Sequence, residues 1–231
     1  MRVFAISDFH LSFGVRNKPM DVFGNNWTGH WEKISSFSKE NIAEDDIILS
    51  SGDTSWGMTI DEALPDLSAV NELPGKKFII RGNHDYWWSS YKKISSLGLD
   101  SIQFIQNNAF KIGQFVICGT RGWTVAEKDA TDEDKKIFER EKIRLKLTLN
   151  QGRKLLSDGD KLILLMHYPP FNSRFENSDF TDIIAENAVD KVIYGHLHGG
   201  RSRFSPIVNK ENTDYILTSC DFLDFTPLQI Y

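Results

Sequence analysis

Cysteine is scarce in this chain of 231 residues, which contains only Cys118 and Cys220. Both lie in apolar, strand-like stretches, so we expect reduced core residues and no disulfide framework. Two isolated cysteines also exclude a structural zinc site made of several thiolates.

Long apolar runs are missing as well. No stretch of about 18 apolar residues exists, so we expect no transmembrane helix and no membrane partner. The N-terminal stretch MRVFAISDFH has neither the apolar length nor the small-residue cleavage site of a signal peptide. We therefore expect a cytoplasmic protein.

Basic clusters and linkers are also lacking. No run of lysine or arginine stands out and the net charge is −5, which argues against a nucleic-acid partner. No repeat, low-complexity tract or Pro/Gly-rich linker divides the chain, so we expect one domain over residues 1–231. The oligomeric state is left open.

Short apolar runs that end in polar or glycine-containing clusters dominate the chain. Their lack of polar alternation predicts strands buried on both faces. The five runs are RVFAIS (2–7), DDIILSS (45–51), KKFIIR (76–81), KLILLM (161–166) and DKVIY (190–194). Three later strand-like runs have fewer helices between them, so part of the sheet is expected to be antiparallel or to form a second sheet. These later runs are 114–119, 214–220 and 225–231.

Helical patterning lies between the strands. The predicted helices are residues 30–40, 60–73, 88–97, 132–156 and 179–187. Pro65 is expected to delay or kink the second helix. In the longest helix, one face carries Phe138, Leu145, Leu149 and Leu156. Thr131 and Asp134 form a capping signal at its start. Alternating strands and helices predict a layered α/β fold.

Candidate metal ligands follow the five apolar runs. Ligands of α/β proteins bind beyond the carboxyl ends of strands, so five loops are expected to converge on one site. The candidates are Asp8, His10, Asp53, Asn83, His84, Asp85, His167, His196 and His198. Each of these residues, taken alone, is typical of a turn, a cap or a buried histidine. Their order along the chain and their position at strand ends together predict a metal site. Imidazole, carboxylate and amide ligands without thiolate suit Mn, Fe, Zn or Co.

The number of ligands predicts two ions. Seven plausible ligands exceed the needs of one tetrahedral ion but fit two ions about 3.5–4 Å apart that share a carboxylate. His196 and His198 stand at positions i and i+2, which point to the same side of an extended backbone. Each histidine is therefore expected to reach a different ion, and the glycines beside them to allow a close turn.

The ordered motif set resembles the calcineurin-like metallophosphoesterase superfamily. The matching blocks are Asp8-x-His10, Gly52-Asp53, Gly82-Asn83-His84-Asp85, His167 and Gly195-His196-x-His198. This resemblance spans residues 8–198. It implies a fold of the α/β class, a four-layer α/β/β/α sandwich with mixed sheets. It is highly specific for the superfamily and poorly specific for the substrate.

The resemblance also implies residue roles. The implied ligands of the first ion are Asp8, His10 and His198. Those of the second ion are Asn83, His167 and His196. Asp53 would bridge both ions. His84 would be the catalytic histidine, kept protonated and oriented by Asp85, and Asn83 would also meet the substrate.

The implied activity is hydrolysis of a small phosphomonoester or phosphodiester, with nucleotides included. Two divalent ions, Mn, Fe or Zn before Co, Ni or Mg, would activate a bridging hydroxide for in-line attack, and His84 would protonate the leaving group. The alternatives are a phosphoprotein phosphatase and, from another class, a non-catalytic scaffold of the same fold. The complete ligand set and His84 argue against the scaffold.

Several features around the motifs allow two interpretations. The six tryptophans either anchor loops or form an aromatic wall for the leaving group. They are Trp27, Trp31, Trp56, Trp87, Trp88 and Trp123. Residues 12–31 either cover the site as a lid or wrap the surface, and residues near 124–157 read as a helical insertion. Arg121 is the preferred phosphate clamp, ahead of Arg81, Arg174 and Arg201, whereas His30 reads as structural.

Overall fold

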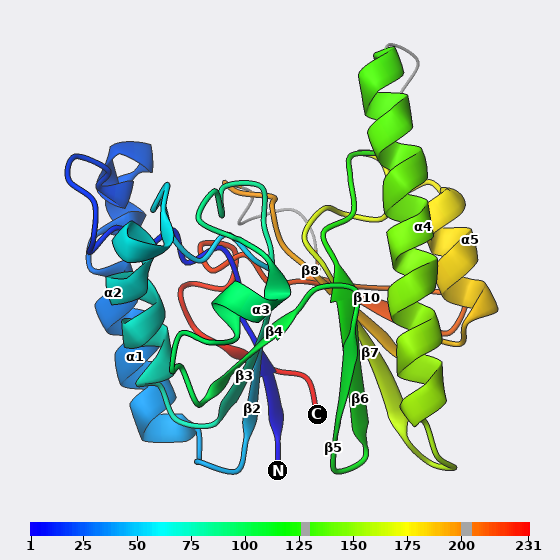
Figure 1. Ribbon diagram of the computed structural model, residues 1–231, viewed down its shortest axis with the longest axis horizontal. Helices are drawn as coiled ribbons and strands as arrows, with labels where there is room; N and C mark the ends of the chain where they lie inside the picture. The colour runs from blue at the N-terminus through cyan, green and yellow to red at the C-terminus, as the bar shows by residue number, and fades with distance from the viewer. Residues whose placement is uncertain (126–129, 200–204) are drawn as a thin grey trace.

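The computed structural model describes residues 1–125, 130–199 and 205–231, and two β-sheets pack face to face within it (Figure 1). The first sheet has the order β11-β1-β2-β3-β4 and the second the order β5-β6-β7-β8-β10-β9. The strands of the first sheet are β1 Val3–Ala5, β2 Ile47–Ser50, β3 Lys76–Ile80, β4 Ile102–Ile105 and β11 Leu228–Gln229. Those of the second are β5 Ala109–Ile112, β6 Phe115–Thr120, β7 Lys161–Met166, β8 Lys191–Tyr194, β9 Ile207–Lys210 and β10 Thr213–Leu217.

Helices cover the outer faces of both sheets, so the layers run α/β/β/α as expected (Figure 1). α1 His30–Asn41 and α2 Ile60–Asn71 lie on the first sheet. α4 Asp132–Leu155 and α5 Asp179–Glu186 lie on the second. The remaining helices are the short segments η1 Met20–Phe23, η2 Asn25–Trp27 and α3 Tyr91–Ile94.

Both sheets are mixed, which confirms the expectation of a second sheet with antiparallel parts. Strands β1, β2, β3 and β4 run parallel to one another, whereas the edge strand β11 is antiparallel to β1. In the second sheet β6, β7, β8 and β10 run parallel, and the edge strands β5 and β9 run antiparallel.

The central strands are buried on both faces. Ile47 and Leu49 of β2 pack between the two sheets, whereas Ile48 packs toward α1 and α2. Cys118 of β6 packs toward α4, and it and Cys220 are free thiols in the interior, as expected. Within the described ranges, no helix combines the length and the apolar character that crossing a membrane requires.

The longest helix has the predicted start. Thr131 and Asp134 form a capping box, and Phe138, Leu145 and Leu149 are buried. Leu156 instead lies just beyond the end of α4. The helix packs along β5 and β6 as the outer layer. Of the expected insertion at 124–157, residues 126–129 lie outside the described residues.

Two helix predictions were wrong in detail. The helix expected at 88–97 is only one turn, Tyr91–Ile94, because Trp87 and Trp88 leave the loop to pack on Phe104. Pro65 does not delay α2, which begins at Ile60 after a Thr59 capping box and continues past the proline. Three buried side chains on the inner face of α2 stabilise it: Ala63, Leu67 and Val70.

Candidate metal centre

Polar side chains from both sheets converge where parallel strands end. The candidate ligands follow β1, β2, β3, β7 and β8, and they are Asp8, His10, Asp53, Asn83, His167, His196 and His198. Parallel strands present their carboxyl ends at one edge, so the layered fold places five loops together. The structure brings all seven side chains into two adjoining groups.

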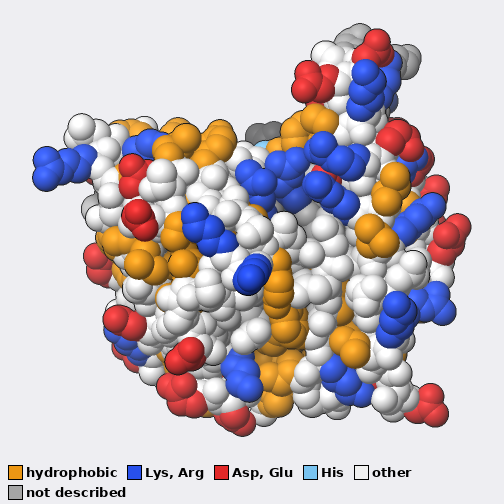
Figure 2. Space-filling view, viewed as in Figure 1, with side chains coloured by type: hydrophobic (Ala, Val, Ile, Leu, Met, Phe, Trp, Pro, Cys, Tyr) orange, Lys and Arg blue, Asp and Glu red, His pale blue; other side chains and the backbone are white. Residues whose placement is uncertain are grey.

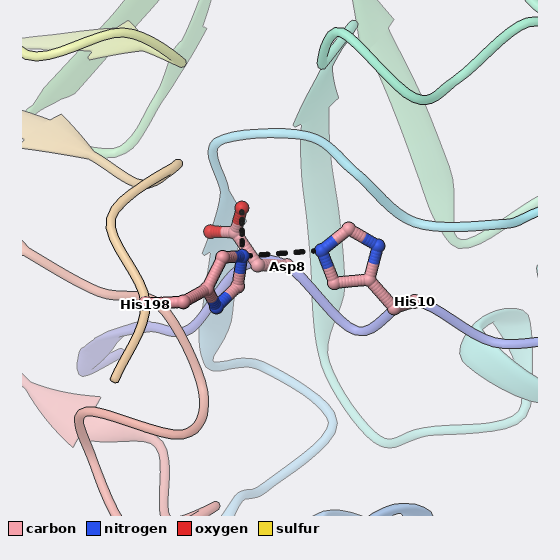
Figure 3. Close-up of side chains that lie close together, drawn as sticks. All are labelled: Asp8, His10 and His198. Carbon is pink, nitrogen blue, oxygen red and sulfur yellow. Dashed lines mark hydrogen bonds and ion pairs between the residues drawn. The ribbon is translucent and has the colours of Figure 1, made fainter. Parts of the chain in front are cut away.

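The first group is Asp8, His10 and His198 (Figure 3). One ligand atom of each residue lies within 4.8 Å of the others. The Nε2 atoms of His10 and His198 are 3.2 Å apart, and His198 Nε2 is 3.7 Å from Asp8 Oδ1. The side chains therefore point toward one another around a common centre.

The second group is Asn83, His167 and His196. Asn83 Oδ1 lies 2.6 Å from His167 Nε2 and 2.8 Å from His196 Nδ1. Nδ1 of His167 lies 2.9 Å from the Ser51 carbonyl, to which it must donate, so Nε2 of the neutral ring carries a lone pair. A lone pair and an amide oxygen facing each other fit a shared cation.

Asp53 lies between the two groups. Its Oδ2 is 3.8 Å from His10 Nε2 and 3.6 Å from His167 Nε2, and its Oδ1 accepts a hydrogen bond from the His84 backbone at 2.7 Å. This position suits a carboxylate shared by two ions.

His196 and His198 belong to different groups, but not because they sit on one side of an extended strand. The chain has left β8 at Tyr194, and His196 has a φ of +71°. This left-handed turn, disfavoured for a residue with a Cβ, aims the two rings apart.

Three further candidate ligands share this unusual backbone. Asp8, His10 and Asp53 have φ values of +59°, +49° and +52°. Such strain costs about 1–3 kcal/mol per residue and concentrates at functional sites. Two glycines let the backbone approach closely: a Cβ on Gly82 would lie 2.0 Å from Asp53 Oδ1, and one on Gly195 would lie 2.2 Å from Asp8 Oδ2.

The electrostatics of the protein alone favour a bound cation. Burial, with the charges of Asp85 and Asp8, raises the pKa of Asp53 to about 9. Burial also lowers the pKa values of His167 and His196 to about 4, which keeps both rings neutral, as ligands must be. Burial acts to lower the pKa of His198 as well, but its hydrogen bond to Asp221 and the charge of Asp8 outweigh burial and raise that pKa. Buried carboxylates and imidazoles without a thiolate fit borderline divalent metal ions.

His84 and Asp85 do not form the interaction that the sequence analysis predicts. Asp85 is fully buried and accepts hydrogen bonds from the backbone N–H groups of Gly82, Asp53, Thr54 and Ser55. Nδ1 of His84 has no hydrogen-bond partner. Burial lowers the pKa of His84, and the charge of His198 lowers it further. Asp85 thus supports the loops after β2 and β3 and does not orient the His84 ring.

Sequence reasoning missed Asp221. Its Oδ1 lies 2.9 Å from His198 Nδ1, and its Oδ2 accepts from the Gly199 backbone at 2.9 Å. A carboxylate behind a ligating histidine fixes its tautomer and aims its other nitrogen at the metal. The available signal was its position after the apolar run 214–220, which ends like the five motif runs.

A cavity of about 640 Å³ opens beside His10, His84 and His198. Residues 12–31 supply part of its wall with Met20, Phe23, Asn26 and Trp27. Trp56 stacks on His10 with 4.9 Å between ring centroids. Trp87 and Trp88 instead belong to the hydrophobic core, and Trp31 packs against that core. Some tryptophans therefore line the cavity, whereas others anchor loops by packing.

The other side chains named from sequence lie at the edge of the site. The Arg121 carbonyl accepts from the His167 backbone at 3.0 Å, and its guanidinium lies 4.9 Å from the centre of the Trp123 ring. His30 lies within 3.1 Å of the Phe9 and Trp27 carbonyls, a structural position. Arg174 is exposed, and Arg201 lies outside the described residues.

These observations define a two-sheet α/β protein with a buried Asp/His metal-binding cluster at the carboxyl ends of its strands. The sequence pattern of the calcineurin-like phosphoesterases matches residues 1–200, and the chain belongs to that family. A metal-dependent phosphoesterase is the class that this membership and the cluster indicate.

Solved structures share the fold. TT1561 of Thermus thermophilus is 11% identical to this chain in sequence. The structural match has a TM-score of 0.59 and includes 99% of this chain and 97% of TT1561. AQ665 from Aquifex aeolicus, described as a protein of unknown function, is 14% identical, with coverage of 99% and 95% and a TM-score of 0.50. A comparison with curated proteins gave no match.

Proposed function

We propose that this protein hydrolyses small phosphate esters with two divalent metal ions. The observation that carries the proposal is the position of Asp53 between two groups of imidazoles, 3.8 Å from His10 and 3.6 Å from His167. A scaffold that had lost its chemistry would have no need for such a buried, strained arrangement.

The two groups divide the ligands. Asp8, His10 and His198 would hold one ion and Asn83, His167 and His196 the other, with Asp53 shared. Two divalent ions bound there would neutralise the phosphoryl oxygens and lower the pKa of water at the site.

His84 would handle the proton of the leaving group. Its half-buried ring lines the cavity and lies 4.6 Å from the Trp56 ring. The N–H of a histidine that lines the cavity can donate to an ester oxygen or to a phosphoryl oxygen. Arg121, whose carbonyl accepts from the His167 backbone at 3.0 Å, would bind an anionic oxygen of the substrate.

The shape and charge of the site favour a small substrate. The cavity of about 640 Å³ is lined by Met20, Phe23 and Trp27, a size that suits a small ester, whereas a phosphoprotein would require a shallow surface. The net charge of −5 disfavours DNA or RNA, whose binding depends on basic surfaces. We propose the small ester ahead of the phosphoprotein, in the cytoplasm and without a membrane partner.

The test combines metal analysis with a substrate panel. The purified protein is loaded with Mn, Fe, Zn, Co, Ni or Mg and assayed on phosphomonoesters, bis-p-nitrophenyl phosphate, nucleotides and a phosphopeptide. We expect two ions per chain and hydrolysis of a small ester, with both lost in Asp53→Asn. Two bound ions without hydrolysis would favour the scaffold. Preference for the phosphopeptide would favour the phosphatase, and degradation of plasmid DNA a nuclease.

A further inference from the structure

Two arginines of α4 flank a buried carboxylate, and two more follow neighbouring strands. Glu141 of α4 is fully buried; Arg144 donates to its Oε1 at 2.6 Å, and Arg140 lies 3.6 Å from the same oxygen. Arg81 follows β3 and Arg121 follows β6, two strands that contact each other, and β6 packs on α4. Figure 2 shows Lys and Arg side chains gathered on this face, between α4 and the loops of the first sheet.

Arg81 and Arg121 lack an acidic partner in the described part of the chain. The Nε atom of Arg81 is buried and makes no hydrogen bond. The guanidinium of Arg121 packs on Trp123 and forms no ion pair with the described carboxylates. Leaving a buried donor unpaired is unfavourable, so the described residues alone do not satisfy Arg81.

The backbones of the two arginines leave neighbouring strands beside the candidate metal ligands. The ends of β3 and β6 touch, since a Cβ on Gly119 would lie 2.7 Å from the Ile80 side chain. Arg81 directly precedes Gly82, where a Cβ would lie 2.0 Å from Asp53 Oδ1, and the Arg121 carbonyl accepts from the His167 backbone at 3.0 Å. Two positive charges on these adjoining strand ends favour an anion.

We propose that Arg81 and Arg121 form a subsite for a second anionic group of the substrate, a phosphate or carboxylate on the leaving group. Bound metal ions would neutralise the scissile phosphate, which leaves the Arg81 charge for another anion. Guanidinium forks pair with phosphate and carboxylate in two-point fashion. Glu141 neutralises Arg144 and keeps α4 beside the subsite. This subsite rests on the proposed phosphoesterase activity.

The test uses matched substrates that differ in one group. The metal-loaded protein is assayed on propane-1,3-diol monophosphate, its 1,3-bisphosphate and 3-phosphooxypropanoate. We expect kcat/KM for one ester with a second anionic group to exceed that of the monophosphate by about tenfold or more, because that group would form charged hydrogen bonds. The preferred ester shows whether the second group is a phosphate or a carboxylate.

Variants assign the preference to Arg81. Arg81→Met should lower the ratio of kcat/KM values about tenfold, mainly through KM, and Arg81→Lys should restore part of it. Arg153→Met is the matched control, because Arg153 lies on the last turn of α4 and contacts Asn187; it should keep the wild-type ratio. A ratio near one in the wild type, or one that Arg81→Met does not change, overturns the subsite.

A binding measurement separates this proposal from the proposed function. Calorimetry compares propane-1,3-bisphosphonate with propylphosphonate on the metal-loaded wild type, with no turnover required. Tighter binding of the bisphosphonate without hydrolysis of any ester would support the subsite and contradict the phosphoesterase. Equal binding of both phosphonates, with ester hydrolysis intact, would contradict the subsite alone.

Discussion

The second ring nitrogen fixes the orientation of two histidines of the site. Nδ1 of His167 faces the Ser51 carbonyl and Nδ1 of His198 faces Asp221, so each ring is fixed with Nε2 directed at the centre. Within the described residues, Nδ1 of His10 and of His84 has no hydrogen-bond partner. The position of each ring therefore separates these two: His10 lies 3.8 Å from Asp53, whereas His84 lines the cavity.

Replacement of His84 tests this division. His84→Ala should retain both metal ions, because Asn83 keeps its contacts with His167 and His196. Turnover should fall by roughly 10²–10⁴-fold, the contribution typical of a general acid. Metal analysis beside steady-state kinetics checks both outcomes. Loss of metal with residual activity in proportion to metal content would show that His84 is a ligand.

Asp221 should control the ion held by His198. Asp221→Asn weakens the acceptor for His198 Nδ1–H, and loss of such a partner typically costs about 10–100-fold in metal affinity. Titration with Mn or Zn should show one weakened ion and one unchanged. Asp158→Asn, in an exposed turn, is the control. Equal weakening of both ions would contradict the separate roles of the two groups.

At the scale of elements, an ion pair ties the start of β1 to the start of β2. Arg2 donates to Asp46 at 2.6 Å from its backbone N–H and 2.6 Å from its guanidinium. Burial of Asp46 acts to raise its pKa, but these hydrogen bonds and the one from Ala43 outweigh it and lower the pKa to about 2.

The stabilisation by Asp46 should depend on pH. The folded pKa of about 2 lies below the ordinary aspartate pKa of 3.8, so the stabilisation is complete above pH ~4 and is lost as pH falls toward ~2. Asp46→Asn should lower the free energy of unfolding by about 1–3 kcal/mol near neutral pH, and the deficit should shrink in acid. Denaturant titrations across pH measure it. Asp45→Asn, an exposed neighbour, should change little, and a deficit independent of pH would contradict the assignment.

The segment 12–31 depends on a close contact with α2. A Cβ on Gly14 would lie 2.0 Å from the Glu62 carbonyl, and the Phe13 N–H donates to Asp66 at 2.6 Å. Gly14→Ala should therefore destabilise the fold by about 1–3 kcal/mol and raise KM, because Met20, Phe23 and Trp27 line the cavity. Thermal unfolding and kinetics measure both effects. An unchanged KM would mean that the segment wraps the surface without shaping the site.

At the scale of the molecule, the metal centre joins the two sheets. Asp8, Asp53 and Asn83 come from the first sheet, and His167 and His196 come from the second. Ions bound to all five would cross-link layers that otherwise meet through apolar side chains.

Metal removal should therefore lower thermal stability. Ligand at 100 times its Kd adds about 2.7 kcal/mol, and each kcal/mol shifts the midpoint of a domain of this size by about 2–4 °C. Loading with Mn or Zn should raise the midpoint by roughly 5–10 °C over the chelated protein. Asp53→Asn should show a smaller rise. A midpoint that stays constant while metal content falls to zero would contradict the cross-link.

Much of the site could be predicted because it depends on local patterns. Short apolar runs specify buried strands, and parallel strands must end at one edge, so the positions of Asp8, Asp53 and His167 followed from sequence. Thr131 and Asp134 predicted the start of α4 because a capping box involves only neighbouring residues. The burial of Trp87 and Trp88, which shortened the helix expected at 88–97, depends instead on a distant strand.

The sequence by itself determined the layered class of the protein, the strand ends that bear chemistry and the types of ligand they offer. Only the tertiary structure decided which side chains face each other. Asp85 follows His84 in the chain yet turns to backbone N–H groups, whereas Asp221, 23 residues beyond His198, holds its ring. The reason is physical: a pattern of hydrophobicity reports burial along one segment, but the partner of a buried polar group comes from whichever segment packing brings beside it.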